Sequence, residues 1–501
     1  EFRRVLFRSV VLGIDFGSQR ITAYVSCGTQ RSVVSDETGN RFIDACLYCG
    51  DGEMVVGSPV KQLARSSPAN VIYHPMQYLD GRSDPRHPNQ VATTDSEGYP
   101  LFAIPGSDPL SLETVLTELF KKVLALASLP FHKKPCISVI AVSQDLSESH
   151  RNYILRCARK AKLPNPSILA SHLCAAVHNE QTRAPLANGT LVVLDVPANT
   201  ANLSVLRVQE GLYRSLPLQR LAVRVGDQMD DALFAFALRD AARRISPEVA
   251  DAKKARAKLA GETHRAKEAL STTNNTTITI ESLFDGRDYS LSVTQARFDM
   301  LTHAVTDTLV AEVKEKLDAL AVSLSEIASV LLIGGCALAP SVRDALRGLF
   351  GDKLVLETHC DEVVAEGAAM HAQMRYDHKL RKTLPVIQML TMGLTCVVGE
   401  QKTPLVCEGT AIPVKGDGEM HVSSETRCIE IVGDCHGEAK LIGKLETELS
   451  LCEKDLAISF VANAIDGVQI RIQVKTGTTV ESEYVVTVKR SEERRVGKEC
   501  R

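Results

Sequence analysis

The fold is decided by one stretch, Val10-Val-Leu-Gly-Ile-Asp-Phe-Gly-Ser-Gln-Arg-Ile-Thr-Ala-Tyr-Val25. An apolar run ends in Asp15, a turn containing Gly17 follows, and apolar residues alternate again from Ile21 to Val25. This pattern predicts two strands joined by a tight polar turn. Backbone N–H groups in such a turn can approach an anion, and a carboxylate at the strand end can hold a hydrated metal. Alone, the stretch fits a phosphate-binding turn or an ordinary hairpin.

The same arrangement returns in the stretch Leu191-Val-Val-Leu-Asp-Val-Pro-Ala-Asn-Thr-Ala-Asn-Leu-Ser-Val-Leu206. Asp195 takes the place of Asp15, and Leu203 and Val205 resume the apolar alternation. A strand, an acid, a turn and a strand, used twice, indicate two similar lobes that face one nucleotide. The repeat therefore favours the phosphate-binding interpretation over two unrelated hairpins.

The composition is that of a soluble globular chain with two or three domains. The 501 residues are 44% hydrophobic and 24% charged, with a net charge of −3 and no tryptophan. The near-neutral charge gives no overall attraction to nucleic acid or membranes. The closest cysteine pair, Cys46 and Cys49, has no second pair at zinc-site spacing, which predicts reduced thiols in a cytoplasmic protein and no metal site. Residues 1–9 and 491–501 have the character of non-native tails.

Secondary-structure signals change along the chain. Ser111 is expected to cap a helix that runs to Ala127. Further helices are expected over 147–162, 226–242, 252–270 and 295–320, with buried strands at 137–142 and 330–333. Beyond about residue 390 only strand patterns with turns occur. These signals predict an α/β domain over 10–380, a linker over 381–390 and an all-β domain over 391–490.

Several motifs occur in a fixed order. They are Gly13-Ile-Asp-Phe-Gly17, Leu194-Asp195 with Thr200, Gly226-Asp-Gln-Met-Asp230, Arg265-Ala-Lys-Glu-Ala-Leu-Ser271, Ile280-Glu-Ser-Leu-Phe-Asp-Gly286, Arg297-Phe298, Ile333-Gly-Gly335 and Asp361-Glu-Val-Val-Ala-Glu-Gly-Ala-Ala369. In these motifs the chain from Val10 to Arg490 resembles the DnaK-type heat-shock chaperones. The resemblance implies an α/β actin-like ATPase domain with two pseudo-repeated lobes, followed by an all-β sandwich that binds peptides. We expect ATP to bind between the lobes as a structural ligand. The residues that the resemblance implies for this site are Asp15, Gly17, Ser18, Gln19, Asp195, Asn199, Thr200, Lys267, Ser271, Gly334, Gly335 and Asp361.

The chain departs from the family where the family hydrolyses ATP. Met76 and Gln77 stand where the family has a Lys-Arg pair, and that lysine stabilises charge on the transferring phosphoryl group. Loss of such a group typically lowers the rate by about 10²–10³. Three successive glycines of the family are replaced by Pro197, Ala198 and Asn199. Because proline removes an N–H donor, we expect the second phosphate turn to be incomplete.

Three more family positions have changed their chemistry. The acid of the Asn-Glu-Pro motif falls on Ser171, and an acid and an arginine that contact adenosine fall on His264 and Glu268. No helical pattern follows the last strand, so the family's lid is expected to be missing. These departures resemble the Ssz-type chaperones, which pair with the J-protein zuotin as the ribosome-associated complex. That complex stimulates a separate active chaperone on nascent chains.

The sequence therefore supports a non-hydrolysing co-chaperone. One alternative is a conventional ATP-dependent peptide-binding chaperone whose missing groups are replaced from elsewhere in the chain. Another, a sugar kinase on the same core, has no place for the β domain. The cations of residues 252–270 are expected to form a solvated face, and the isolated His172, His178 and His264 are expected to pack or to face solvent.

Overall fold

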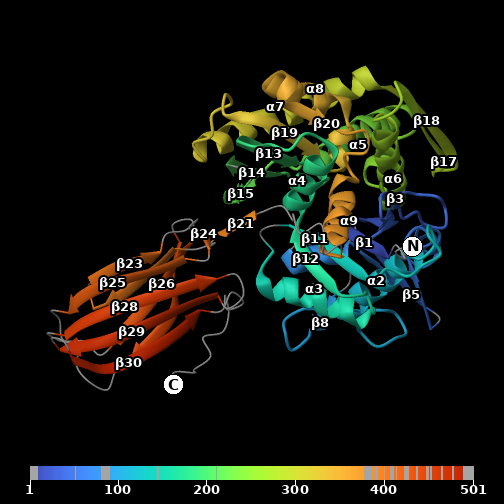
Figure 1. Ribbon diagram of the computed structural model, residues 1–501. Coiled ribbons are helices and arrows are strands. Elements are labelled where there is room, and N and C mark those ends of the chain that lie inside the picture. Colours follow the sequence, from blue (N-terminus) through green and yellow to red (C-terminus); the bar gives the residue numbers. More distant parts are fainter. Residues whose placement is uncertain are drawn as a thin grey trace, which may run out of the picture. The chain divides into compact units, whose positions relative to one another are not determined.

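The computed structural model describes the chain between Ser9 and Val488 with internal gaps. The described residues are 9–50, 52–80, 91–143, 146–209, 212–376, 386–389, 393–399, 401–406, 411–412, 414–422, 428–435, 438–446, 451, 454–463, 467–476 and 479–488. They form two compact units. The first comprises Glu1–Leu146, Tyr153–Leu206 and Leu218–Thr383, and the second comprises Ser147–Asn152, Arg207–Pro217 and Leu384–Arg501. Helices and strands alternate in the part coloured blue to orange, whereas the red part contains strands (Figure 1).

A mixed sheet with the strand order β12-β11-β1-β2-β3, to which β4 adds beside β2, forms the first lobe. Its strands are β1 (Val10–Phe16), β2 (Arg20–Cys27), β3 (Gln30–Val33), β4 (Ile43–Asp44), β11 (Ile137–Val142) and β12 (Pro166–Ala170). Strand β1 is antiparallel to β2 and parallel to β11. Nearly every residue of β1 is buried, as expected for a strand that is covered on both faces.

The sheet of the second lobe repeats this plan with the strand order β20-β19-β13-β14, and β16 pairs with β14. Its strands are β13 (Gly189–Asp195), β14 (Asn202–Gln209), β16 (Gln219–Arg220), β19 (Ile327–Ile333) and β20 (Leu354–Leu356). Strand β19 is parallel to β13, as β11 is to β1. The two strand–turn–strand elements expected from the sequence are therefore both present. Each ends its first strand next to an acid, Asp15 or Asp195.

Helices cover these sheets and connect their strands. They are α1 (Val60–Ser66), α2 (Leu112–Ala127), α3 (Glu148–Lys160), α4 (Ser171–Thr182), α5 (Val225–Arg244), α6 (Lys253–Ala269), α7 (Gln295–Ala319), α8 (Pro340–Phe350) and α9 (Val363–Tyr376). The helix expected after Ser111 begins at Leu112, and the Ser111 hydroxyl accepts a hydrogen bond of 3.2 Å from the Thr114 N–H. This bond satisfies one of the free N–H groups at the helix start.

Smaller sheets lie at the edges of the first unit. They are β5 (Cys46–Gly50) with β6 (Glu53–Val56) and β7 (Val71–Tyr73), then β8 (Val91–Thr94) with β9 (Pro100–Phe102) and β10 (Leu110–Ser111), and the hairpin of β17 (Asn275–Phe284) with β18 (Arg287–Thr294). Cys46 and Cys49, which lie on β5, are free thiols. None of the helices in the described part of the chain combines the length and the apolar character needed to cross a membrane.

Two glycines allow helix α9 to pack closely enough to fix strand β1. A Cβ atom on Gly13 would lie 2.1 Å from the backbone nitrogen of Ala369 in α9. A Cβ atom on Gly367 would lie 1.9 Å from the carbonyl oxygen of Cys174 in α4. Real Cβ contacts are never this short, so both positions require glycine. Helix α9 thereby locks β1, and with it the strand end that carries Asp15.

The second unit contains a two-sheet β structure. One sheet has the order β23-β22-β26-β27 and the other β25-β28-β29-β30. The strands are β22 (Gly393–Val398), β23 (Gln401–Val406), β25 (Val414–Val422), β26 (Cys428–Cys435), β27 (Glu438–Glu446), β28 (Lys454–Asn463), β29 (Gly467–Thr476) and β30 (Thr479–Val488). Alternate residues such as Ile429 and Ile431, or Ile470 and Ile472, are buried in one apolar core. This alternation is the period of two that a half-buried strand requires.

Part of the expected linker over 381–390 is a strand. Residues 381–385 and 390 lie outside the described residues, but Val386–Met389 forms β21. Strand β21 is parallel to β15 (Leu212–Ser215), with Tyr213 opposite Val386, and antiparallel to β24 (Ala411–Ile412). The segment is apolar enough to pair at a sheet edge, which the sequence did not reveal because its partner lies far earlier in the chain. The expected tails lie outside the described residues except Ser9.

Candidate functional site

One cavity of about 670 Å³ lies in the first unit and receives residues from both lobes. This volume is in the range of sites that hold a nucleotide-sized ligand. Every residue of the sequence-based site lines it. These residues are Asp15, Gly17, Ser18, Gln19, Asp195, Asn199, Thr200, Lys267, Ser271, Gly334, Gly335 and Asp361, together with the altered positions Met76 and Ser171. The structure thus brings together positions that are far apart in the sequence.

Three carboxyl groups gather in this cavity. Burial, reinforced by the charges of Asp195 and Asp361, raises the pKa of Asp15 to about 8. Burial also raises the pKa of Asp195 to about 6 and raises that of Asp361. Each shift means that the folded protein disfavours the ionised carboxylate. The acids therefore favour a proton or a cationic ligand beside them.

The first turn keeps the geometry of an anion cradle. A Cβ atom on Gly17 would lie 2.6 Å from the carbonyl oxygen of Arg20, so the turn closes only with glycine at this position. Ser18 and Gln19 complete the turn and line the cavity. Small residues between two buried strands leave backbone N–H groups accessible to an anion.

The second turn has lost donors in two ways. Pro197 has no N–H group, and the N–H of Thr200 donates to the side-chain oxygen of Asn199 at 2.9 Å. The carbonyl oxygen of Ala198 accepts a hydrogen bond of 2.9 Å from the N–H of Asp227, which ties the turn to helix α5. The second turn therefore offers an anion fewer N–H donors than the sequence of a glycine turn would.

Two glycines after strand β19 have different surroundings. Gly334 has φ of +94°, and a Cβ atom there would lie 2.7 Å from the backbone of Val196 and 2.8 Å from a carboxylate oxygen of Asp195. Gly334 is therefore needed for the close packing of this loop on the second turn. A Cβ atom on Gly335 would have no neighbour within 4 Å. Gly335 leaves space in the cavity wall that a ligand can fill.

Met76, which the resemblance sets at the family's lysine position, packs in the apolar core and also lines the cavity. Met76 is on the short 3₁₀ helix η2 (Pro75–Asp80), is 8% exposed and belongs to the main hydrophobic cluster of the first lobe. Its neighbour Gln77 is also buried, and the amide nitrogen of Gln77 has no hydrogen-bond partner among the described residues. Gln77 lines the cavity, so this buried amide lies beside the space in which a ligand would bind. The segment can contribute to binding, but it presents no charge for phosphoryl transfer.

Helix α6 lines the opposite wall with paired charges. The ammonium group of Lys267 donates to Asp230 at 2.8 Å and to the carbonyl oxygen of Gly226 at 3.3 Å. Nδ1 of His264 lies 3.0 Å from Asp230, and Nε2 of His264 lies 3.6 Å from Glu268. Burial alone would raise the pKa of Asp230, but the bond with His264 and the charge of Lys267 outweigh burial and lower it.

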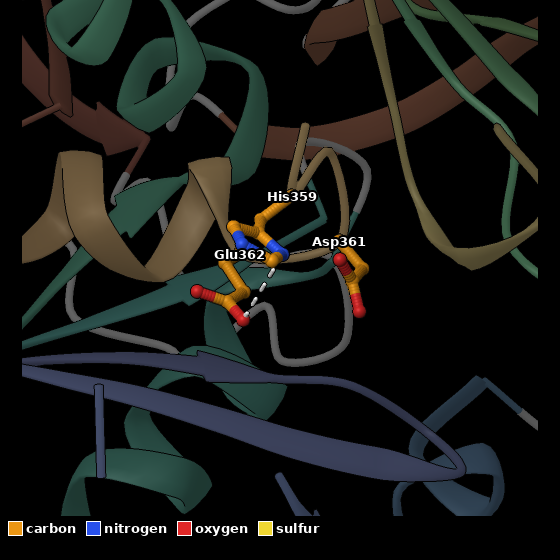
Figure 2. A group of neighbouring side chains, drawn as sticks. All are labelled: His359, Asp361 and Glu362. Atoms are coloured by element: carbon orange, nitrogen blue, oxygen red, sulfur yellow. Dashed lines mark ion pairs between the residues drawn. The ribbon is translucent and has the colours of Figure 1, made fainter. Parts of the chain in front are cut away.

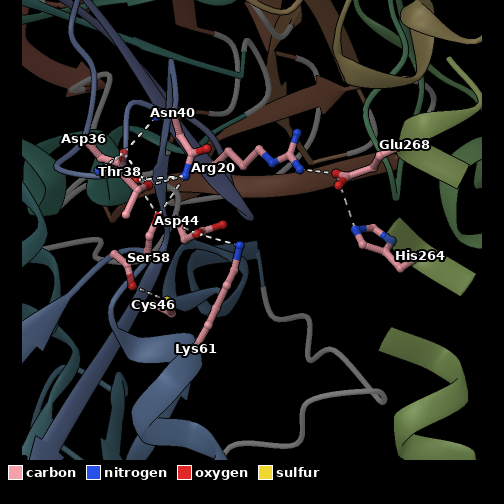
Figure 3. Close-up of polar contacts among 11 residues, drawn as sticks. Arg20, Asp36, Thr38, Asn40, Asp44, Cys46, Ser58, Lys61, His264 and Glu268 are labelled. Carbon is pink, nitrogen blue, oxygen red and sulfur yellow. Dashed lines mark hydrogen bonds and ion pairs between the residues drawn. The ribbon is translucent and has the colours of Figure 1, made fainter. Parts of the chain in front are cut away.

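An ion pair that the sequence did not predict connects the two lobes. Arg20, the first residue of β2, extends its guanidinium group to Glu268 on α6 (Figure 3). Cζ of Arg20 also lies 4.0 Å from the centroid of the Phe42 ring. Both charged residues line the cavity. The only sequence signal was a charge at the start of a buried strand, because its partner lies 248 residues away.

A second polar group holds the loop that carries Asp361. His359, Asp361 and Glu362 have side-chain ligand atoms within 4.8 Å of one another, and Figure 2 shows these three side chains together. The guanidinium group of Arg41 donates to both oxygens of Glu362 at 2.5 and 2.8 Å, and the Tyr24 hydroxyl donates at 2.6 Å. Glu362 is thereby committed to anchoring the loop, and we assign no metal to this group.

Comparison with known proteins agrees with this architecture. The chain matches the family described as "Hsp70 protein" over residues 11–432. It is 27% identical over 425 residues to heat shock 70 kDa protein BIP3 of Oryza sativa subsp. japonica, covering 81% of this chain and 63% of the rice protein. It is 25% identical over 379 residues to heat shock 70 kDa protein 14 of Danio rerio, covering 72% and 74%. A protein of Saccharomyces cerevisiae described as a ribosome-associated molecular chaperone is 25% identical over 382 residues, covering 72% and 60%.

The described residues form an α/β unit of two lobes and a β unit. In the α/β unit, the repeated strand–turn–strand elements line one cavity. The family match extends over more than four fifths of the sequence and includes both turns. The chain is a member of the Hsp70 family. It spans less than two thirds of the length of some relatives that it matches, including the rice protein.

Proposed function

We propose that this chain is a chaperone-family protein that binds ATP as a structural ligand and hydrolyses little or none of it. The observation that carries the proposal is the burial of Met76 in the core at the position of the family's phosphoryl-stabilising lysine. The missing charge accounts for a loss of about 10²–10³ in rate, or roughly 3–4 kcal/mol. The donors lost at Pro197 and Thr200 lower the stabilisation of transferring phosphate further.

Retained features support nucleotide binding without turnover. The first turn, the open space at Gly335 and the amide of Gln77, which no described residue pairs, can all receive a nucleoside phosphate. Hsp70 proteins are nucleotide-binding ATPases, and the cavity has kept the residues that surround a nucleotide better than those that act on it. ATP in excess should therefore raise the unfolding temperature, because a ligand that binds only the folded state stabilises it.

The proposed cellular role is that of a partner protein in the cytoplasm. A chaperone that does not cycle nucleotide needs a lasting contact to act, and we propose a stable pair with a zuotin-type J-protein on ribosomes. In this proposal the pair stimulates an active chaperone of the same family on nascent polypeptides. The description of the yeast relative, a ribosome-associated molecular chaperone, supports this placement. The edge strands of the β unit are suited to accept an extended segment of the J-protein.

The test is co-expression with the J-protein. Gel filtration should give a heterodimer, and the chain should pellet with ribosomes only when the J-protein is present. A monomer beside its J-protein, or equal pelleting alone, would contradict the partner assignment. The alternative is a conventional ATP-dependent peptide-binding chaperone. Turnover of ATP that rises on addition of peptide would establish that alternative instead.

A further inference from the structure

The cavity has few positive charges for a ligand that carries several negative ones. The permanently charged cations that line it in the described part of the chain are Arg20, Arg220 and Lys267. Lys267 is held by Asp230 and is 12% exposed in its side chain. Arg20 follows the intact first turn directly, which places its backbone next to the anion cradle. Among these cations, Arg20 is the one that begins the strand directly after the first turn.

The guanidinium group of Arg20 lies between two acidic regions. It pairs with Glu268 across the cavity, and its charge also lowers the pKa of Asp361, against the larger effect of burial. The stack on Phe42 supports the arginine without using any of its N–H donors. The side chains of Arg20 and Glu268 are 37% and 41% exposed, so their pair is accessible to solvent and to competing anions.

We propose that Arg20 is an exchangeable phosphate-binding residue: it pairs with Glu268 when the cavity holds no nucleotide and turns to the phosphates when a nucleotide enters. Glu268 thus competes with the phosphates of the nucleotide for the guanidinium group of Arg20. This inference rests on the proposed binding of ATP. It adds the residue that meets the phosphates and a carboxylate that limits the affinity.

The exchange is physically reasonable because the two partners are similar. A guanidinium group binds carboxylate and phosphate with the same planar fork of N–H donors. A nucleoside triphosphate carries more charge than one carboxylate and can displace it. An exposed ion pair is weak, and a competitor of that strength lowers apparent ligand affinity by about two- to five-fold. Replacement of Glu268 should raise the affinity for ATP by that factor. Replacement of Arg20 should remove a contact with phosphate and lower the affinity.

The experiment is calorimetric titration of the full chain with Mg²⁺–ATP, ADP and adenosine. Glu268→Gln should bind ATP about two- to five-fold more tightly than the wild type. Glu262→Gln is its control, since Glu262 lies on the same helix and pairs with Arg265. Arg20→Gln should weaken ATP and ADP about ten-fold, because charge-assisted bonds contribute more than neutral ones. Arg20→Gln should not weaken the binding of adenosine, which has no phosphate.

Lys61→Gln is the control for Arg20→Gln. Lys61 lies on the same lobe, pairs with Asp44 at 2.8 Å and does not line the cavity. Both Arg20 and Lys61 appear in Figure 3. Equal ATP affinity of Arg20→Gln and Lys61→Gln would overturn the role of Arg20 and leave the proposed binding of ATP intact. An Arg20→Gln variant that loses adenosine as strongly as ATP would also overturn it.

Two further outcomes separate this inference from the proposed function. If the wild type binds no ATP but Glu268→Gln does, the competitor role is supported and the proposed structural ligand is wrong for the wild type. If no variant binds ATP, both proposals fail. A second readout uses the absence of tryptophan from the chain. In Phe42→Trp the single indole should change its emission when ATP draws Arg20 away, and no change beside measured binding would contradict the exchange.

Discussion

The two turns of the cavity share one plan and differ in what they can offer a phosphate. At the first turn, the carbonyl group of Arg20 approaches so closely that only glycine fits at position 17, and Gly17 is present there. At the second turn, proline has removed one donor and Asn199 satisfies another through Thr200. Both turns still end buried strands in matching positions. The comparison teaches that two strands of the same plan can end in turns that leave different numbers of N–H donors open to a ligand.

The largest effect is expected at the missing lysine. Met76→Lys would remove an apolar side chain that packs in the core of the first lobe and also lines the cavity, and we expect a loss of about 2–3 kcal/mol in the free energy of unfolding, because the lost packing exceeds what contact of the ammonium group with the cavity can return. Hydrolysis should not return, because the second turn remains altered. Thermal unfolding and phosphate release measure the two results. Met54→Lys, at a methionine that is 44% exposed on β6, is the control and should be nearly neutral. Restored hydrolysis with wild-type stability would contradict this account.

Two glycines sharpen the contrast between packing and ligand space. Gly17→Ala should destabilise the protein by about 2 kcal/mol, because its Cβ atom would collide with backbone. Gly335→Ala should leave stability within about 0.5 kcal/mol of the wild type, since a Cβ atom there meets nothing within 4 Å. Gly335→Ala should nevertheless lower the affinity for ATP, because the added methyl group fills space beside the ligand. Denaturant unfolding and ATP titration of both variants test this. Equal stability of the two variants would show that Gly17 is not a packing requirement.

The paired acids predict a difference in pH dependence. The pKa of Asp15 rises to about 8 and that of Asp195 to about 6, both mainly through burial. The folded state thus favours the protonated acids, and their contribution to stability, complete below about pH 4, falls as the pH rises through these values. Asp15→Asn should raise the free energy of unfolding at pH 8 by about 1–3 kcal/mol, and Asp195→Asn by about 1 kcal/mol.

Unfolding temperatures of both variants at about pH 5 and pH 8 would measure this difference. Asp352→Asn, at an exposed position on the short helix η5 (Gly351–Lys353), serves as the control for replacing an aspartate and should change the free energy of unfolding by less than about 0.5 kcal/mol. A larger gain for Asp195→Asn than for Asp15→Asn would contradict the additional effect that the charges of Asp195 and Asp361 have on Asp15.

The smallest effect is expected from partial repair of the second turn. The double variant Pro197→Gly, Asn199→Gly would restore one N–H group and free that of Thr200. Because a net hydrogen bond contributes about 0.5–1.5 kcal/mol, ATP affinity should rise about three- to ten-fold. Hydrolysis should stay absent. Pro247→Gly, in the 3₁₀ helix η3 (Pro247–Ala250) away from the cavity, controls for the general cost of replacing proline. Unchanged affinity would mean that the second turn does not face the phosphates.

The sequence predicted those parts of the molecule that depend on local pattern. Both acid-ended strands, the Ser111 cap and the alternation of the β unit follow from the residues themselves. The contact of Arg20 with Glu268 could not be predicted, because it depends on how two lobes bring distant side chains together. The bond from Thr200 to Asn199 depends on one rotamer, which no sequence pattern specifies. The pairing of strand β21 with β15 could not be predicted, because the two strands are remote in the chain.

The most direct test of retained binding without hydrolysis is the fate of bound ATP. The full chain in excess over γ-labelled ATP and Mg²⁺ would be isolated by rapid gel filtration, incubated, and quenched for analysis of the nucleotide. We expect the label to elute with the protein and to be recovered as intact ATP after many turnover times of an active Hsp70 protein. Release of labelled phosphate at a rate that Asp15→Asn abolishes would contradict the account.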